Sequence, residues 1–226
     1  MDPLNWLFDA QLQIGGKGIL WREIVGNAFG LVSALGGMRR RIWAWPVGIV
    51  GNLLLFTVFL GAVFDTPGNE NLLGQAGRQV MFIAVSIYGW NRWRETRGSG
   101  APAVTPRWAT WKERLALLLA AAVGIGVLTP LFRALGSWEP VWADAWIFTG
   151  SVLATYGMAR GWVDFWLVWI LVDVVGVRFL LKAELYPSAV MYIVYGAFCV
   201  AGLVVWIRSR DRLATTPRDP AVEAVA

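Results

Sequence analysis

Histidine is absent from this sequence of 226 residues, cysteine occurs once, and charged residues make up only 15%. Without histidine there is no His-based catalytic triad, no His metal site and no His proton relay. The single Cys199 excludes an internal disulfide framework and a Cys-based zinc site. Apolar residues reach 57% and the mean hydropathy is +0.54, whereas soluble domains carry about 25% charged residues. These values predict a membrane protein rather than a soluble one.

Three long segments contain no Asp, Glu, Lys or Arg: 42–64, 115–132 and 188–207. Each is long enough to approach or span a hydrocarbon core of about 30 Å. The net charge of +5 comes mainly from basic residues that flank apolar segments, which is typical of membrane topology, so we expect no nucleic-acid partner. Residues 1–13 have neither the basic start nor the long apolar run of a signal peptide, so we expect no cleavage.

The apolar segments predict an all-α integral membrane protein with seven transmembrane helices. The predicted helices are 19–38, 42–64, 76–93, 113–135, 141–159, 162–181 and 187–207. The residues between the third and fourth helices are rich in glycine, serine and proline, which is typical of a linker. We therefore expect an extracellular N-terminal segment at 1–18, a first three-helix repeat at 19–93, a cytoplasmic linker at 94–112, a connector helix at 113–135, a second three-helix repeat at 141–207, and a disordered cytoplasmic tail at 208–226.

The basic residues predict the orientation in the cell membrane. Fourteen of the 20 Lys and Arg residues fall on one side of the predicted helices. The other six are Lys17, Arg22, Arg78, Arg133, Arg178 and Lys182. Because positive residues favour the cytoplasm, we expect the N-terminus outside and the C-terminus inside.

Short matches between the two halves indicate an internal repeat. Trp45 and Asn52 correspond to Trp166 and Asp173 at an offset of 121 residues. Further matches join Gly37-Met38 to Gly157-Met158, Val80-Met81-Phe82 to Val190-Met191-Tyr192, and Gly89 with Trp93 to Gly202 with Trp206. With one connector helix between them, both units share one orientation. This predicts a 3+1+3 parallel repeat, an arrangement in which transporters place the substrate at the repeat interface.

Asn52 and Asp173 are the polar residues closest to the predicted membrane midplane. A carboxylate at that depth is costly and usually faces a cavity or a partner. The alternative is that both residues only form hydrogen bonds between helices. Their equivalent places in the two repeats favour a shared central site.

Aromatic and polar residues recur at helical spacing around the same depth. Trp166, Trp169 and Asp173 share one face, as do Gln79, Phe82, Ser86 and Trp90. The candidate substrate-binding residues are Trp45, Asn52, Phe56, Gln79, Ser86, Trp90, Trp166, Trp169, Asp173, Tyr192 and Tyr195. Such a set suits a planar ligand with polar edges, although Trp and Tyr also form interfacial belts. Glu23 and Asn27 line an outer entrance, or Glu23 pairs with Arg22 or Arg78.

Three motifs resemble the PnuC-like vitamin transporter family over residues 19–207. They are Trp21-x-Glu23, Gln79-x-x-Phe82 leading to Tyr88-Gly89-Trp90-x-x-Trp93, and Trp166-x-x-Trp169-x-x-x-Asp173. The third is similar to the family's W-x-x-W-x-x-x-N pattern, with Asp173 where Asn is usual. Segments 19–24, 156–162 and 186–190 look most like the family's actinobacterial riboflavin-transporting branch.

The resemblance implies a seven-helix arrangement similar to that of the SWEET sugar transporters, usually oligomeric. It also implies facilitated diffusion of an unphosphorylated vitamin that a cytosolic kinase, here a flavokinase, traps inside the cell. Riboflavin is the expected substrate; the alternative is nicotinamide riboside or another unphosphorylated vitamin such as thiamine. The charge of Asp173 by itself favours the cationic nicotinamide riboside over neutral riboflavin.

Other functional classes lack their motifs in this sequence. There is no Gly-x-Ser-x-Gly element and no Walker A sequence, so we expect no enzyme activity and no bound cofactor. The last predicted helix contains no lysine, which excludes a retinal Schiff base there. The chain has no nucleotide-binding domain for primary active transport.

Overall fold

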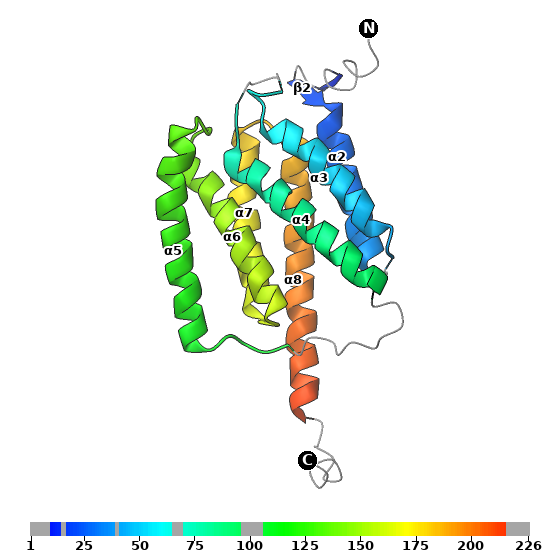
Figure 1. Ribbon diagram of the computed structural model, residues 1–226, viewed down its shortest axis with the longest axis vertical. Coiled ribbons are helices and arrows are strands. Elements are labelled where there is room, and N and C mark those ends of the chain that lie inside the picture. The colour runs from blue at the N-terminus through cyan, green and yellow to red at the C-terminus, as the bar shows by residue number, and fades with distance from the viewer. Residues whose placement is uncertain (1–9, 15–16, 39–40, 65–69, 96–105, 216–226) are drawn as a thin grey trace.

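The protein is described by a computed structural model over residues 10–14, 17–38, 41–64, 70–95 and 106–215. Within these ranges, two short strands precede seven helices (Figure 1). The elements are β1 (Gln11–Ile14), β2 (Lys17–Leu20), α2 (Trp21–Met38), α3 (Ala44–Phe59), α4 (Leu73–Glu95), α5 (Trp111–Ala134), α6 (Val141–Ala159), α7 (Asp164–Lys182) and α8 (Tyr186–Thr215). All seven predicted helices are therefore present.

Two helix ends differ from the prediction by five residues or more. Helix α3 ends at Phe59 and not at 64, because the chain turns at Leu60 and Gly61 donates its N–H to Glu70 O at 2.9 Å. Helix α8 continues to Thr215, so residues 208–215 are helical and do not belong to a disordered tail. Arg, Leu and Ala, which make up five of these eight residues, are good helix formers, so the helix does not end where the apolar run ends. The rest of the predicted tail, 216–226, and most of the linker, 96–105, lie outside the described residues.

The N-terminal segment contains an antiparallel hairpin that the sequence did not predict. Strand β1 pairs with β2 so that Gln11 lies opposite Leu20. The hairpin leads directly into α2, and Trp21 donates its N–H to Ala10 O at 3.0 Å.

Six of the helices close a circuit of contacts. Helix α2 packs on α3, α3 on α4, α4 on α6, α6 on α7, α7 on α8, and α8 on α2. The pairs α2/α8 and α4/α6 join the first three helices to the last three. Side chains directed into this ring therefore come from both halves of the chain.

Helix α5 lies outside the ring and packs on α6 (Figure 1). None of its residues is buried, and its contact with α6 includes an edge-on pair of rings, Phe132 and Phe148, with centroids 6.4 Å apart. A capping box between Thr110 and Glu113 begins the helix. Gly136 follows its end with φ of +80°, a conformation that glycine adopts without the steric cost other residues meet. A helix of this kind is well suited to connect two units that already pack on each other.

Two of the described helices are long and apolar enough to cross a membrane by length and composition: Trp111–Ala134 and the Tyr186–Arg208 part of α8. Ala44–Phe59 is similarly apolar but has only 16 residues. The other helices carry polar side chains, many of them directed into the ring, which lowers their mean hydropathy.

Candidate functional site

One face of α4 supplies the polar centre of the ring. Gln75, Arg78, Gln79 and Phe82 follow one another at helical spacing, and the first three are buried. The Arg78 guanidinium lies over two aromatic rings, with Cζ 4.6 Å from the centroid of Tyr192 and 5.4 Å from that of Phe82. Only 9% of Arg78 is exposed. A charged group is thus buried between α4 and α8.

Two tyrosines of α8 reach across the ring. The Tyr192 hydroxyl donates to Gln75 Oε1 at 2.8 Å, which links α8 to α4. Tyr195 approaches α2, because a Cβ atom placed on Gly30 would lie 3.1 Å from the Tyr195 hydroxyl oxygen. On the α7 side, Trp169 packs against Phe82 with ring centroids 6.0 Å apart. Aromatic side chains of α7 and α8 therefore lie beside the face of α4.

Asp173 directs its carboxylate from α7 toward α8. A Cβ atom placed on Gly196 would lie 3.6 Å from Asp173 Oδ2, and Asp173 is buried. Asp173 Oδ2, Gln75 Nε2 and Arg78 Nε are buried and have no hydrogen-bond partner among the described residues. Asp173 and Arg78 do not form a direct ion pair. The ring interior thus offers one acceptor and two donors whose hydrogen-bonding capacity is unused, beside aromatic faces.

The predicted site residues fall into three groups. Gln79, Trp169, Asp173, Tyr192 and Tyr195 meet in or beside the ring interior. Trp45 and Trp166 pack against Gly89 and Gly202 of the next helix, Ser86 faces Gly48 across the α3–α4 contact, and Phe56 contacts Phe64 near the end of α3. Asn52 and Trp90 are half-buried on α3 and α4.

The sequence prediction missed Arg78 and Gln75. Arg78 was counted only among the basic residues that predict the orientation, and the structure shows that its side chain is buried. The signal that could have found it is its spacing: it precedes Gln79 by one residue and Phe82 by four, on a helix already assigned to the site. Glu23 does not pair with Arg78.

Glu23 and Asp144 instead hold the beginnings of two helices. Glu23 Oε1 accepts the backbone N–H of Ser188 at 3.0 Å, near the start of α8. The Asp144 carboxylate accepts the N–H groups of Gly74 at 2.6 Å and Gln75 at 2.9 Å, near the start of α4. Each carboxylate satisfies donors that a helix leaves unpaired. In both cases a helix of one half is capped by a residue of the other half.

The same glycine contacts occur in both halves. A Cβ atom placed on Gly36 would lie 3.0 Å from Ala44 Cβ, and one on Gly157 would lie 3.0 Å from Phe165 Cβ, both at an offset of 121 residues. A Cβ atom placed on Gly51 would lie 3.0 Å from Phe29 Cβ, and one on Gly150 would lie 2.5 Å from Val172 Cγ2. Position 172 follows position 51 by 121 residues, and position 150 follows position 29 by the same number. These contacts favour a uniform offset of 121 for the first two helices, so Gly157 corresponds to Gly36 and not to Gly37.

The third helices of the two halves show a different offset. A Cβ atom on Gly89 would lie 2.7 Å from Cζ3 of Trp45, and one on Gly202 would lie 2.7 Å from Cζ3 of Trp166. The offset between Gly89 and Gly202 is 113 residues. In this register Tyr192 corresponds to Gln79 and not to Phe82.

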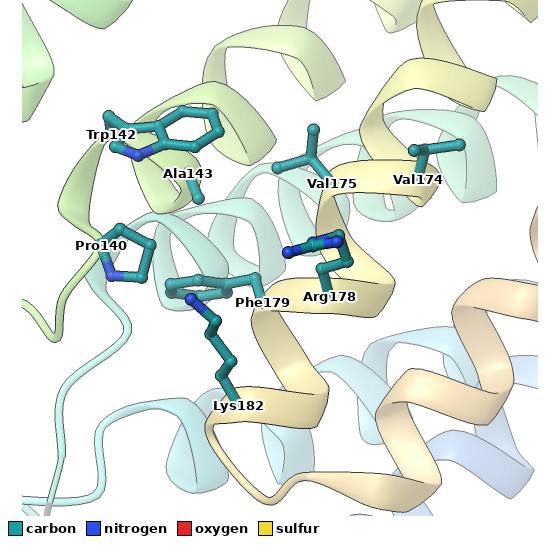
Figure 2. Close-up of a pocket in the computed structure, with 8 residues that line it drawn as sticks. All are labelled: Pro140, Trp142, Ala143, Val174, Val175, Arg178, Phe179 and Lys182. Atoms are coloured by element: carbon teal, nitrogen blue, oxygen red, sulfur yellow. The ribbon is translucent and has the colours of Figure 1, made fainter.

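A pocket between α6 and α7 lies away from this interior (Figure 2). Trp142 and Val174, which line it, are 52% and 59% exposed, so it opens on the outer face of the bundle. Arg178 and Lys182 enter it from successive turns of α7, on either side of Phe179 (Figure 2). It shares no residue with the cluster around Arg78, and we do not assign the substrate to it.

The chain is similar to known transporters along most of its length. The family model for the nicotinamide mononucleotide transporter matches residues 20–208. The riboflavin/roseoflavin transporter RibM of Streptomyces davaonensis is 40% identical, with 92% of this chain and 94% of that protein covered. The nicotinamide riboside transporter PnuC of Escherichia coli is 26% identical over the same shares.

A solved structure has the same fold. The crystal structure of the vitamin B3 transporter PnuC matches with a TM-score of 0.63 and 21% identity, covering 85% of this chain and 83% of that one. With the family model and the 40% identical relative, this match accounts for the seven helices and for the membrane setting. The chain therefore belongs to the nicotinamide mononucleotide transporter family, the PnuC-like membrane transporters of vitamins, and is not an enzyme.

Proposed function

We propose that this protein takes up riboflavin and flavin analogues across the cell membrane by facilitated diffusion, and that a cytosolic flavokinase then traps the vitamin. The observation that carries the proposal is the 40% identity to a riboflavin/roseoflavin transporter over 92% of the chain, against 26% to a nicotinamide riboside transporter. The alternative substrate is nicotinamide riboside, which the Asp173 carboxylate favours by charge.

The substrate site in this proposal lies in the ring interior between two three-helix units joined by α5. Its central residues are Asn52, Gln79, Trp169, Asp173 and Tyr192, with Tyr195 at its edge. Recurrence of the glycine–tryptophan contacts in both halves supports a 3+1+3 arrangement similar to that of the SWEET transporters. The rings of Phe82, Trp169 and Tyr192 supply faces on which an isoalloxazine ring can stack, and such a stack contributes about 1–3 kcal/mol by analogy with nucleic-acid bases. The proposal includes a homo-oligomer, which the mass of the purified protein would test.

Uptake of labelled riboflavin tests the substrate. In cells that lack a riboflavin transporter but contain flavokinase, expression of this protein should give uptake that micromolar unlabelled riboflavin blocks. Nicotinamide riboside and thiamine at the same concentration should not block it. Initial uptake should persist with an uncoupler, and accumulation should fail without the kinase. If nicotinamide riboside competes better than riboflavin, the alternative substrate replaces the proposed one.

Cysteine labelling tests the proposed orientation, with the N-terminus outside and residues 94–112 in the cytoplasm. In a Cys199→Ser background, Ser99→Cys should resist an impermeant maleimide added to intact cells and react after permeabilisation. Val63→Cys, an exposed residue at the opposite end of α3 from the linker side, should react in intact cells. Labelling of Ser99→Cys in intact cells would reverse the orientation.

A further inference from the structure

We propose that Arg78 determines substrate selectivity: its guanidinium donates hydrogen bonds to the carbonyl-rich edge of a flavin and excludes a cationic pyridinium ring. The inference rests on the proposed uptake of riboflavin and adds the residue that selects it. It also reverses the charge argument made from Asp173 alone, because that argument did not include a second buried charge.

The position of Arg78 suits recognition of a ligand in the ring. The guanidinium lies over the Tyr192 and Phe82 rings at 4.6 Å and 5.4 Å, contacts that orient a planar cation. Its Nε has no partner among the described residues. An arginine presents five N–H donors in a rigid fork that matches two neighbouring acceptors, which a lysine ammonium cannot reproduce. Donors held in place and unused before the ligand arrives are what a selective site requires.

Arg78 is the arginine whose guanidinium lies against the aromatic rings of the interior. Asp173 is the carboxylate that directs an oxygen without a hydrogen-bond partner among the described residues toward α8, whereas Glu23 and Asp144 accept backbone N–H groups at helix starts. A fixed positive charge on a ligand that stacks against these rings would lie close to the Arg78 guanidinium and be repelled by it. A neutral ligand meets no such repulsion, so the site favours a neutral ring over a cationic one.

The unused polar atoms match the edge of a flavin. Its pyrimidine ring carries two carbonyl oxygens and one ring nitrogen that accept hydrogen bonds, and one N–H that donates. Arg78 and Gln75 Nε2 supply donors, and Asp173 Oδ2 supplies an acceptor for that N–H or for a ribityl hydroxyl. The pyridinium ring of nicotinamide riboside carries a positive charge and a single carboxamide. It therefore has only one carbonyl oxygen that can accept hydrogen bonds from Arg78 and Gln75.

Two substitutions separate the charge of Arg78 from its geometry. Arg78→Lys keeps the charge and removes the fork; we expect the apparent KM for riboflavin to rise at least 10-fold while nicotinamide riboside still fails to compete. Arg78→Gln removes both; we expect a similar rise in KM, and competition by nicotinamide riboside. Arg178→Gln makes the same change in the outer pocket of Figure 2 and should leave both readouts as in the wild type. The amount of each variant in the membrane is measured from a fluorescent tag.

Three results would overturn the inference. One is a wild-type KM for riboflavin in Arg78→Lys, a variant that keeps the buried charge and so tests the fork even if Arg78→Gln does not reach the membrane. Another is unchanged exclusion of nicotinamide riboside in Arg78→Gln. The third is recovery of the wild-type KM in the double variant Arg78→Gln/Asp173→Asn, which would make Arg78 only a counter-ion of Asp173. Failure of the proposed function itself would be seen separately, as a wild-type protein that does not take up riboflavin.

Discussion

Asp173→Leu should reduce uptake of riboflavin at least 100-fold, whereas Asp173→Asn should retain measurable uptake. Leucine removes Asp173 Oδ2, which faces α8 and has no hydrogen-bond partner among the described residues, and it removes one of the negative charges near Arg78. Asparagine has the same size and keeps an oxygen that accepts hydrogen bonds. The W-x-x-W-x-x-x-N pattern of the PnuC-like family also has Asn at this position. Asn52→Leu, at the corresponding place on α3, is expected to have a comparable effect. Uptake of labelled riboflavin is measured at matched amounts of protein in the membrane.

The control for this prediction is the amount and the shape of the protein. Both leucine variants should elute from size-exclusion chromatography as the wild type does. Normal uptake by Asp173→Leu and Asn52→Leu together would show that these residues only pack helices and that the substrate binds elsewhere. Loss of uptake in Asp173→Asn equal to that in Asp173→Leu would show that the charge, and not the acceptor, is required.

The second large effect is expected on stability, from Asp144→Ala. This change removes the acceptor of two backbone N–H groups at the start of α4 and of the Ser137 hydroxyl, which donates to Asp144 Oδ2 at 2.9 Å. Each buried polar group left unsatisfied costs about 1–3 kcal/mol, so a loss of about 3–5 kcal/mol is expected. For a chain of this size that corresponds to a fall in melting temperature of roughly 10 °C in detergent.

Glu139→Ala is the matched control for Asp144→Ala. Glu139 lies just before α6, where its exposed side chain pairs with the exposed Arg133 at 2.9 Å and accepts the Val141 N–H at 3.1 Å. The Arg133 guanidinium holds the pKa of Glu139 below its ordinary value. Exposed ion pairs contribute little to stability, and water can replace the exposed acceptor of Val141, so this variant should melt close to the wild type. Equal melting temperatures of the two alanine variants would contradict a structural role for the Asp144 cap.

The sequence predicted the number of helices because long uncharged segments are a strong signal. The range 141–159 agrees with α6, Val141–Ala159. The ends of α3 and α8 were wrong because a hydropathy pattern reports where the apolar run stops. The backbone of α3 turns earlier, at Leu60, and that of α8 remains helical through charged residues to Thr215.

The residues that meet in the ring interior could be predicted only in part, for a related reason. Gln79, Asp173 and Tyr192 were candidates because polar groups within apolar helices are conspicuous. Arg78 was not a candidate because a basic residue near the end of a membrane helix is ordinary, and only the fold shows that its guanidinium lies over the Tyr192 ring. The partners of Glu23 and Asp144 lie 165 and 69 residues away in the sequence, on helices that only the fold brings together.

The caps of Glu23 and Asp144 have the form of a two-fold contact between identical subunits. Positions 23 and 144 differ by the offset of 121 that relates the first helices of the two halves, and positions 75 and 188 by the offset of 113 that relates the third helices. When position i of one unit meets position j of another, and j meets i in return, the interface is isologous. In a pair of identical three-helix units, the carboxylate on the first helix of each unit could therefore accept the unpaired backbone N–H groups at the start of the other unit's third helix. In such a pair neither unit could complete its third helix alone.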